Sequence, residues 1–377
     1  MGNCCPEPHR QPHRHPISPP RVPSPPLPPT GIVKAKSNKA ASKPDPTVDP
    51  TEDPPVRLYG PEACPLTLRL QLTLLYKGIS PQFIPRESPI LPGPLLRFGG
   101  LGGDVISGSE QELLECIDKK FTTEPNGVVS RLEPAEEVVL AVELQHRSME
   151  RHLEGISRAV KEMSAAGKKG KKTGAAAEGR RISRWYGELV EVMLEHARME
   201  ESLLFPVLER AAYKGVCKVA NKQHAGDLPM LNGIKEFIKS LLSFEAGTSL
   251  YQEALLNLSQ RLKNLQEHCK EHFREEEKEL FPLIDSVYRM QRIEGDISNW
   301  SNSGWVGQVV SATELTHSRL FPFFIAGLLP QEAMEYVDLI CRSTRDPQQL
   351  ASMLQSLTSL LEGTCQSSFI FDSLLRK

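Results

Sequence analysis

The fold is decided by the stretch His196-Ala197-Arg198-Met199-Glu200-Glu201-Ser202-Leu203-Leu204-Phe205-Pro206, which returns as His272-Phe273-Arg274-Glu275-Glu276-Glu277-Lys278-Glu279-Leu280-Phe281-Pro282. Both copies read H-x-x-x-E-E-x-x-L-F-P. On a helix, positions i and i+4 lie one above the other, so each copy should project an imidazole and a carboxylate from one face. The repeat therefore predicts two matched histidine-glutamate pairs.

Four amphipathic stretches surround and contain this repeat. They cover residues 135–163, 182–212, 218–244 and 250–287. The second and fourth stretches carry the two copies, whereas the first and third carry single histidines, His146 and His224. The interval from His146 to His224 is close to that from His196 to His272, as expected for two helical hairpins related by a pseudo-twofold axis. The sequence predicts a four-helix bundle of the kind that holds carboxylate-bridged di-metal sites.

The predicted metal ligands are four imidazoles and two carboxylates, namely His146, His196, Glu200, His224, His272 and Glu276. Imidazole and carboxylate without thiolate favour iron or manganese over zinc, and two carboxylates offset much of the charge of two divalent cations in a dry core. Without metal, the same groups would be buried without partners. Phe205 and Phe281 are expected to line the metal pocket, and packing alone is an equal interpretation. The competing interpretation, two histidines on the solvated faces of acidic helices, is disfavoured by the repeated L-F-P ending.

With these motifs, residues 134–292 resemble a hemerythrin-like, HHE cation-binding domain. The resemblance implies an up-down four-helix bundle that binds two irons, with histidines as terminal ligands, two bridging carboxylates and an oxo or hydroxo group between the irons. The matching residues are the H-x-x-x-E pairs His196/Glu200 and His272/Glu276, the first-helix His146 and the third-helix His224.

One position departs from the oxygen-carrying members of that family. They have a second histidine in the third helix, where this chain has Leu228. The chain is therefore closer to the iron-sensing hemerythrin domains of plant and animal ubiquitin-ligase components, although it has no RING-type array or F-box-like stretch. Among the other candidates, His268 could reach a metal or only solvent, and the expected supporting or exposed residues are His152, Glu201 and Glu277. His317 is excluded as a ligand because no glutamate follows it at i+4.

Residues 56–125 predict a small α/β unit. Strands are expected at 56–60, 82–84, 94–98 and 104–106, with one helix that ends at Gly78 and another over 109–121. The order is β-α-β followed by β-β-α, and the first helix begins at Cys64-Pro65. This pattern resembles the thioredoxin-like amino-terminal domain of glutathione transferases and glutaredoxins.

That second resemblance implies a glutathione site. Cys64 would be the helix-start thiol, activated by the helix dipole and unpaired amides. Pro94 would precede the third strand, commonly in cis, and Ser109-Glu110 would lie near the glutathione carboxylate. The chain has no second cysteine in Cys64-Pro65-Leu66-Thr67, and the acid and serine of the family's Glu-Ser pair are reversed. An inert packing or docking domain stays open.

The remaining segments are a tail and an extension. More than half of the 31 prolines lie in residues 1–55, which predicts a disordered tether. Its start resembles a dually acylated terminus, with myristate on Gly2 and palmitate on Cys4 or Cys5, although Pro6 stands where the pattern has Ser or Thr. An unmodified tail is the alternative. Residues 311–377 predict a C-terminal extension of two or three helices that cap the bundle.

The composition indicates where the protein is located and which classes of protein it does not belong to. The 377 residues include 45 basic and 47 acidic side chains, a net charge of -2 that argues against a dedicated nucleic-acid binder. No signal peptide or membrane-spanning run is present, and the eight cysteines form no C-x-x-C pair. A cytosolic location is expected, with attachment to the plasma membrane if the terminus is acylated.

The predicted protein is therefore multi-domain, α/β plus all-α, with a di-iron centre that senses iron or oxygen or sequesters iron at the cytosolic face of a membrane. No substrate-positioning motif is visible, so binding follows more naturally than turnover. Two alternatives stay open. One is a redox enzyme that uses Cys64, glutathione and peroxide at the di-iron site. The other is a membrane-tethered interaction protein with a structural metal.

Overall fold

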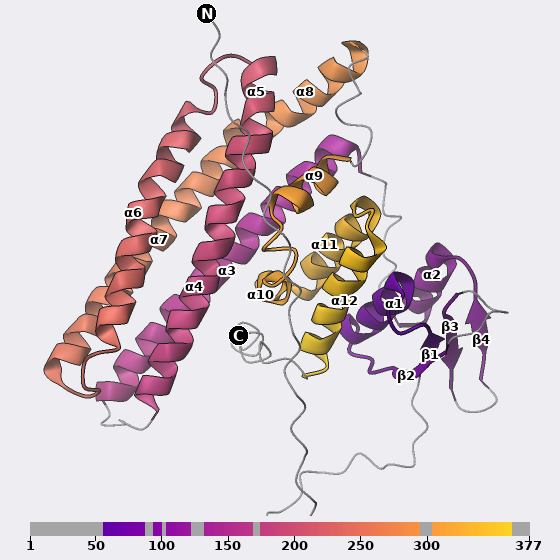
Figure 1. The fold of residues 1–377 in the computed structure, drawn as a ribbon, viewed down its shortest axis with the longest axis horizontal. Helices are drawn as coiled ribbons and strands as arrows, with labels where there is room; N and C mark the ends of the chain where they lie inside the picture. Colours follow the sequence, from indigo (N-terminus) through magenta and orange to yellow (C-terminus); the bar gives the residue numbers. More distant parts are fainter. Residues whose placement is uncertain are drawn as a thin grey trace, which may run out of the picture. The chain divides into compact units, whose positions relative to one another are not determined.

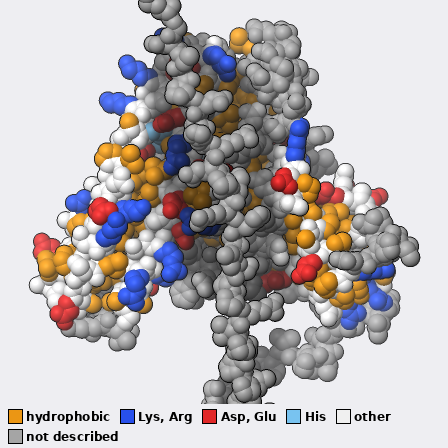
Figure 2. Space-filling model, viewed as in Figure 1, with side chains coloured by type: hydrophobic (Ala, Val, Ile, Leu, Met, Phe, Trp, Pro, Cys, Tyr) orange, Lys and Arg blue, Asp and Glu red, His pale blue; other side chains and the backbone are white. Residues whose placement is uncertain are grey.

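The computed structural model describes residues 56–86, 93–99, 103–121, 132–168, 174–294 and 304–363 (Figure 1). The expected tail and its acylation residues Gly2, Cys4 and Cys5 lie outside the described residues. Within them, no helix has the length and apolar character needed to cross a bilayer. Figure 2 shows basic and acidic side chains interspersed on one face of the described part, in keeping with the nearly equal totals of the two kinds.

The first described unit is a four-stranded sheet with two helices. The strands are β1 (Val56–Gly60), β2 (Gln82–Pro85), β3 (Leu95–Phe98) and β4 (Val105–Ser107), in the order β2-β1-β3-β4. β1 pairs parallel with β2 and antiparallel with β3, and β3 pairs antiparallel with β4. The helices are α1 (Pro65–Tyr76) and α2 (Glu110–Phe121). The predicted order of strands and helices, β-α-β followed by β-β-α, is confirmed.

Local chemistry fixes the ends of α1. Pro65 occupies the first turn, where its missing N–H costs nothing. Gly78 follows the last turn with φ of 74°, a left-handed conformation that glycine adopts without strain. Its N–H donates to the Leu75 carbonyl, and the N–H of Ile79 donates to that of Leu74. The helix therefore ends where the sequence predicts, and it buries Leu70 and Leu74 against the sheet.

Four long helices form the second unit of structure, side by side in Figure 1. They are α3 (Pro134–Lys168), α4 (Ala175–Met199), α6 (Lys218–Leu241) and α7 (Ser249–Glu279). Two of the expected helices are interrupted after their glutamates. A π-helical turn, Glu200–Leu204, and the short α5 (Phe205–Ala211) follow α4, and α8 (Phe281–Glu294) follows α7 after Leu280. Pro206 and Pro282 explain both breaks, because proline cannot donate to the carbonyl four residues before it.

The bundle has two hydrophobic clusters with a polar layer between them. One cluster includes Val142 of α3 together with Phe205 and Phe281. The other includes Met149 of α3 and Leu189 of α4. His146 lies in the sequence between Val142 and Met149, so the buried histidines and glutamates occupy the junction of the two clusters.

The C-terminal helices pack along the side of the bundle. In the described part of the chain they are α9 (Gly304–Ala312), α10 (Phe321–Ala326), α11 (Pro330–Ser343) and α12 (Pro347–Leu361). The extension thus begins at Gly304 rather than at 311. α9, α10 and α11 all contact α3, and α12 contacts α1. The extension thus packs on the bundle along the flank of α3, with α9 also against α4, and α12 joins it to the α/β unit.

Polar side chains on α3 explain this docking. Ser148 Oγ donates to the Phe324 carbonyl over 2.6 Å, and Arg151 donates to the Gly327 carbonyl over 3.1 Å and to both oxygens of Glu332. Gly327 is required at this approach, because a Cβ atom there would lie 2.4 Å from Ser148 Oγ. The flank of α3 is thus built to receive the turn between α10 and α11.

His152 belongs to the same junction. Its Nδ1 accepts from Trp185 Nε1 over 2.9 Å, so its Nε2 carries the proton and donates to the Phe323 carbonyl over 2.8 Å. Burial lowers the pKa of His152 to about 3, which keeps the ring neutral. The expectation that His152 supports the metal ligands or is exposed is wrong, because the ring is buried and holds the C-terminal helices.

Candidate metal centre

The six predicted ligands meet in one buried layer of the bundle. His146 comes from α3, His196 from α4, Glu200 from the π-helical turn, His224 from α6, and His272 and Glu276 from α7. Their exposed fractions range from 1% to 7%. They form two overlapping groups of possible ligands: one contains His146, His196, Glu200 and Glu276, and the other contains His224, His272 and Glu276.

The histidines form two pairs that mirror each other. His146 Nε2 lies 3.1 Å from His196 Nε2, and His224 Nε2 lies 3.1 Å from His272 Nε2. Metal–nitrogen distances are about 2 Å, so two nitrogens at this separation can bind one cation. Each pair is therefore a candidate position for one metal ion.

The two carboxylates lie between the pairs. Glu200 Oε2 is 3.4 Å from Nε2 of both His196 and His224, one histidine from each pair. Glu276 Oε2 is 3.6 Å from Nε2 of both His146 and His272, again one from each pair. This is the placement of carboxylates that bridge two metal ions.

Each histidine is oriented by an acceptor behind its ring. His146 Nδ1 donates to Glu277 over 2.9 Å, and His224 Nδ1 donates to Glu201 over 3.0 Å. Because a carboxylate accepts and does not donate, both Nδ1 atoms carry the proton. Each Nε2 lone pair therefore points into the site, as metal binding requires. Glu201 and Glu277 thus orient ligand histidines, which is the supporting role expected for them.

Two glutamines complete this outer layer. His196 Nδ1 lies 2.7 Å from Gln145 Oε1, and His272 Nδ1 lies 2.8 Å from Gln223 Oε1. Neither glutamine was predicted from the sequence. A signal was available, because each directly precedes a ligand, in Gln145-His146 and in Gln223-His224, so the dipeptide repeats along with the hairpin.

The buried groups of this layer shift the pKa values of the histidines in opposite directions. Burial lowers the pKa of His196 and of His272 to about 3, whereas hydrogen bonds with Glu200 and Glu277 outweigh burial and raise the pKa of His146 to about 9. Hydrogen bonds and charge from Glu200 and Glu201 likewise outweigh burial at His224 and raise its pKa.

The carboxylates divide in the same way. Burial opposes ionisation of Glu200, but the neighbouring histidines hold its pKa well below the ordinary value. Burial and the charge on Glu200 raise the pKa of Glu276 well above it. Glu200 Oε2 and both carboxyl oxygens of Glu276 are buried without a hydrogen-bond partner. Two cations would satisfy these oxygens and the four nitrogens together, so the residues present fit a di-metal centre.

Aromatic rings close the layer on matching sides. Phe281 stacks on His146 with ring centroids 5.8 Å apart, and Phe205 stacks on His224 at 5.6 Å. The two phenylalanines of the repeated L-F-P therefore contact ligand rings, as one of the two sequence interpretations has it. Their rings cover two of the four ligands on the side of the first hydrophobic cluster.

Three other positions lie outside the centre. His268 Nε2 lies 2.6 Å from Asp227 Oδ1 and belongs to neither ligand group. His317 is buried and bonds to Tyr336 and Thr313, in agreement with its exclusion as a ligand. Leu228 is 46% exposed, so it does not fill the centre.

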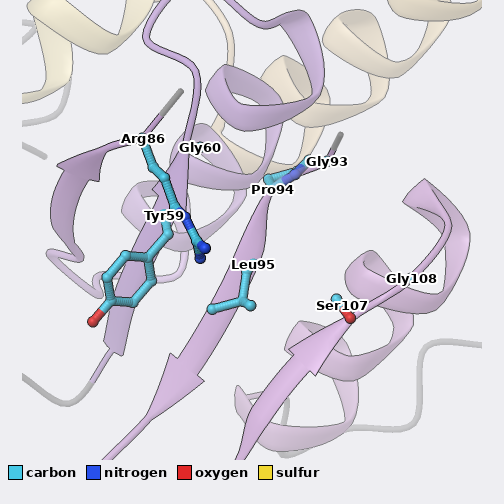
Figure 3. Close-up of a pocket in the computed structure, with 8 residues that line it drawn as sticks. All are labelled: Tyr59, Gly60, Arg86, Gly93, Pro94, Leu95, Ser107 and Gly108. Atoms are coloured by element: carbon cyan, nitrogen blue, oxygen red, sulfur yellow. The ribbon is translucent and has the colours of Figure 1, made fainter. Parts of the chain in front are cut away.

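The α/β unit carries a separate cavity of about 310 Å³ (Figure 3). It is lined by Tyr59, Gly60, Arg86, Gly93, Pro94, Leu95, Ser107 and Gly108. In Figure 3, Arg86 and Tyr59 lie on one side of the cavity and Ser107 on the other. Among these residues, only Pro94 was predicted from the sequence to belong to a binding site. Pro94 is not in cis, since no described peptide bond is.

The expected thiol and serine do not line this cavity. Cys64 is half-buried and precedes the first turn of α1, as predicted, but it is not a lining residue. Ser109 instead caps α2: its backbone N–H donates to Glu112 Oε2 over 2.8 Å, and its Oγ lies at the same distance from that oxygen. Glu110 pairs with Arg69. The structure therefore places Ser109 in helix capping and Glu110 in an ion pair.

Fold and site together define a four-helix bundle with a buried histidine-carboxylate metal centre. A family model described as the Hemerythrin HHE cation binding domain matches residues 138–289, a segment that contains all six ligands. This part of the chain is hemerythrin-like, and the family binds cations. No curated protein and no solved structure matches the chain.

Proposed function

We propose that residues 134–294 bind two iron ions and that the protein senses iron or oxygen, or sequesters iron, through this centre. One observation supports it above the others: two histidine pairs with converging Nε2 atoms, bridged by carboxylates whose buried oxygens have no hydrogen-bond partner. The oxygen and nitrogen donors, with no thiolate among them, suit iron.

The residues have separate tasks in this proposal. His146 and His196 would hold one ion, His224 and His272 would hold the other, and Glu200 and Glu276 would supply the carboxylates shared between the two histidine pairs. Bound iron would supply reversible redox chemistry with oxygen. The phenylalanines and the two hydrophobic clusters keep bulk water away from the ligand layer.

Binding would also change the stability of the bundle. The buried carboxyl oxygens without a hydrogen-bond partner oppose folding, and a cation that binds them stabilises the folded state. Metal content would thereby be converted into a structural signal, which is the property that a sensor requires and a simple carrier does not.

Metal analysis of the purified full chain tests this proposal. The expected result is two iron ions per chain after anaerobic loading, with loss of at least one in His196→Ala and in His272→Ala. His268→Ala is the matched control, because His268 lies on the same helix as His272 but pairs with Asp227. Fewer than one ion per wild-type chain, or full loading of both ligand variants, would overturn it.

We propose as a second function that the α/β unit is thioredoxin-like and that its cavity binds a small anionic thiol such as glutathione. The observation in favour is the cavity itself, since Arg86 and Ser107 lie at opposite sides of it and Pro94 precedes β3. Calorimetry with glutathione tests this function, with Arg86→Gln expected to weaken binding and Lys120→Gln as a control outside the cavity. Absence of heat at millimolar glutathione would refute it, and with it the redox-enzyme alternative that uses Cys64.

We propose for the location a cytosolic protein held at the plasma membrane by acylation of Gly2 and Cys4 or Cys5. The sequence of the terminus is the support. Cell fractionation of wild type and Gly2→Ala tests it, and an unchanged share in the membrane fraction would remove the anchor. A membrane-tethered interaction protein with a structural metal remains the alternative if the iron centre proves redox-inert.

A further inference from the structure

In both halves of the metal centre a glutamine accepts from a ligand histidine: Gln145 from His196 and Gln223 from His272. The two glutamines differ in the group to which they donate. On one half, Gln223 Nε2 donates over 2.7 Å to the half-exposed Glu275 of the same bundle. On the other half, Gln145 Nε2 donates over 3.2 Å to the hydroxyl of Tyr336, which is 1% exposed and belongs to α11. Among the described residues, the hydrogen bonds behind these glutamines thus reach the C-terminal helices only in the second half.

The chain of hydrogen bonds through Tyr336 runs in one direction. His317 Nδ1 lies 2.8 Å from the Thr313 carbonyl, which can only accept, so Nδ1 carries the proton. His317 Nε2 then accepts from the Tyr336 hydroxyl over 2.7 Å. The Tyr336 oxygen in turn accepts from Gln145, whose Oε1 accepts from His196 Nδ1. This order leaves His196 Nε2 unprotonated toward the centre.

The far end of that chain is rigidly held. Glu195, the residue before His196, accepts from the backbone N–H groups of Leu315 and Thr316 over 2.8 and 2.7 Å and from the Thr316 hydroxyl over 2.6 Å. Burial lowers the pKa of His317 to about 4, so the ring is neutral near pH 7 and can accept. The segment that carries His317 is thus fixed next to the ligand helix.

We propose that Tyr336 is a positioning residue for His196 and that this chain couples metal binding at the His146/His196 position to the docking of α11. The inference rests on the proposed metal function. A cation at His196 Nε2 makes Nδ1–H a stronger donor and so strengthens the bond to Gln145. By linkage, a docked α11 raises the affinity of that position by the same factor by which the metal stabilises docking. In the part of the chain that the structure describes, no such hydrogen-bond chain leads from His224 or His272 to α11, so the two ions bind with different affinities.

The test compares three full-length variants with wild type. Tyr336→Phe keeps the buried ring and removes the hydroxyl, Gln145→Met breaks the chain one link nearer to the metal, and Glu275→Ala removes the matching acceptor on the other half, where water can replace it. Stepwise Fe(II) affinities are measured anaerobically against a competing chelator. Hydrogen exchange of residues 330–343 is measured with and without Fe(II).

The expected result is a weaker affinity for one of the two ions, about 3- to 10-fold in Tyr336→Phe and about 10- to 100-fold in Gln145→Met. Fe(II) should slow exchange in α11 of wild type and Glu275→Ala but not in the other two variants. The inference would be overturned if Tyr336→Phe and Gln145→Met bound both ions as tightly as wild type does. Metal-dependent protection of α11 that persists in Tyr336→Phe would also overturn it, and either result would leave the metal centre intact. A wild type that binds no Fe(II) would overturn both.

Discussion

Replacing Glu276 by methionine should make the metal-free protein more stable and the metal-loaded protein less stable. The Glu276 side chain is 2% exposed, and neither of its carboxyl oxygens has a hydrogen-bond partner. A buried polar group without a partner costs about 1 to 3 kcal/mol, and methionine fills a similar volume without polar atoms. The free energy of unfolding in the presence of chelator should therefore rise by about 1 to 3 kcal/mol in Glu276→Met.

When iron is added, wild type should become more stable than Glu276→Met. A ligand at 1,000 times its dissociation constant stabilises the state that binds it by about 4 kcal/mol, and wild type gains this whereas Glu276→Met loses most of it. Urea unfolding followed by circular dichroism measures the free energy of unfolding of both proteins, once with chelator and once with anaerobic Fe(II). Glu279→Met is the matched control, because Glu279 is 65% exposed on the same helix and should change stability by less than about 0.5 kcal/mol. A metal-free Glu276→Met less stable than wild type would refute the reasoning.

Three further outcomes follow from the C-terminal docking and the helices. Gly327→Ala should lose about 1 to 3 kcal/mol in urea unfolding because a Cβ has no room there, whereas Gly233→Ala, in open space within α6, should be neutral or gain up to about 1 kcal/mol; equal effects would contradict the tight approach. Arg151→Met leaves Glu332 without its two-pronged partner and should cost about 1 to 3 kcal/mol by the same assay, and no loss would show that the pair is dispensable. The pKa of His317 is lowered to about 4 in the folded state, so the unfolded state binds more protons between about pH 6.5 and 4 and stability falls as pH falls through that window. The slope in metal-free protein should be smaller in His317→Gln than in wild type by up to about 1.4 kcal/mol per pH unit, and an unchanged slope would rule out a neutral buried ring.

The ligands could be predicted because their spacing is a local property. A histidine and a glutamate four residues apart share a helix face whatever the helix packs against, and two copies of the pattern define where the helices must meet. The single histidines His146 and His224 needed the additional step of matching intervals. All six residues converge as that reasoning requires.

The contacts around the ligands could not be predicted in the same way. The partner of Gln145 is Tyr336, and nothing in the sequence near either residue indicates that α11 packs against α3. The C-terminal helices were expected to cap the bundle, but their apolar spacing does not indicate which helices they contact. Ser148, Arg151 and His152 decide the place, and their carbonyl partners carry no signature in side-chain sequence.

The helix breaks fall between these two cases. Pro206 and Pro282 are visible in the sequence, yet apolar periodicity continues past both, which favours uninterrupted helices. The structure resolves the conflict by a π-helical turn in one copy and a break at Leu280 in the other. Two sequence repeats with the same proline thus reach different backbones, because each hairpin packs against different neighbours.

The hydrogen bonds behind the histidines cross between the two halves of the bundle. His146 of the first hairpin is oriented by Glu277 of the second, and His224 of the second is oriented by Glu201 of the first. Neither hairpin alone can assemble an oriented set of ligands, whereas two identical hairpins facing each other would supply every partner twice. Duplication and fusion of a gene for one hairpin that paired with a second copy of itself would produce this repeat. The two hairpins, expressed separately, should therefore associate with each other when metal is present.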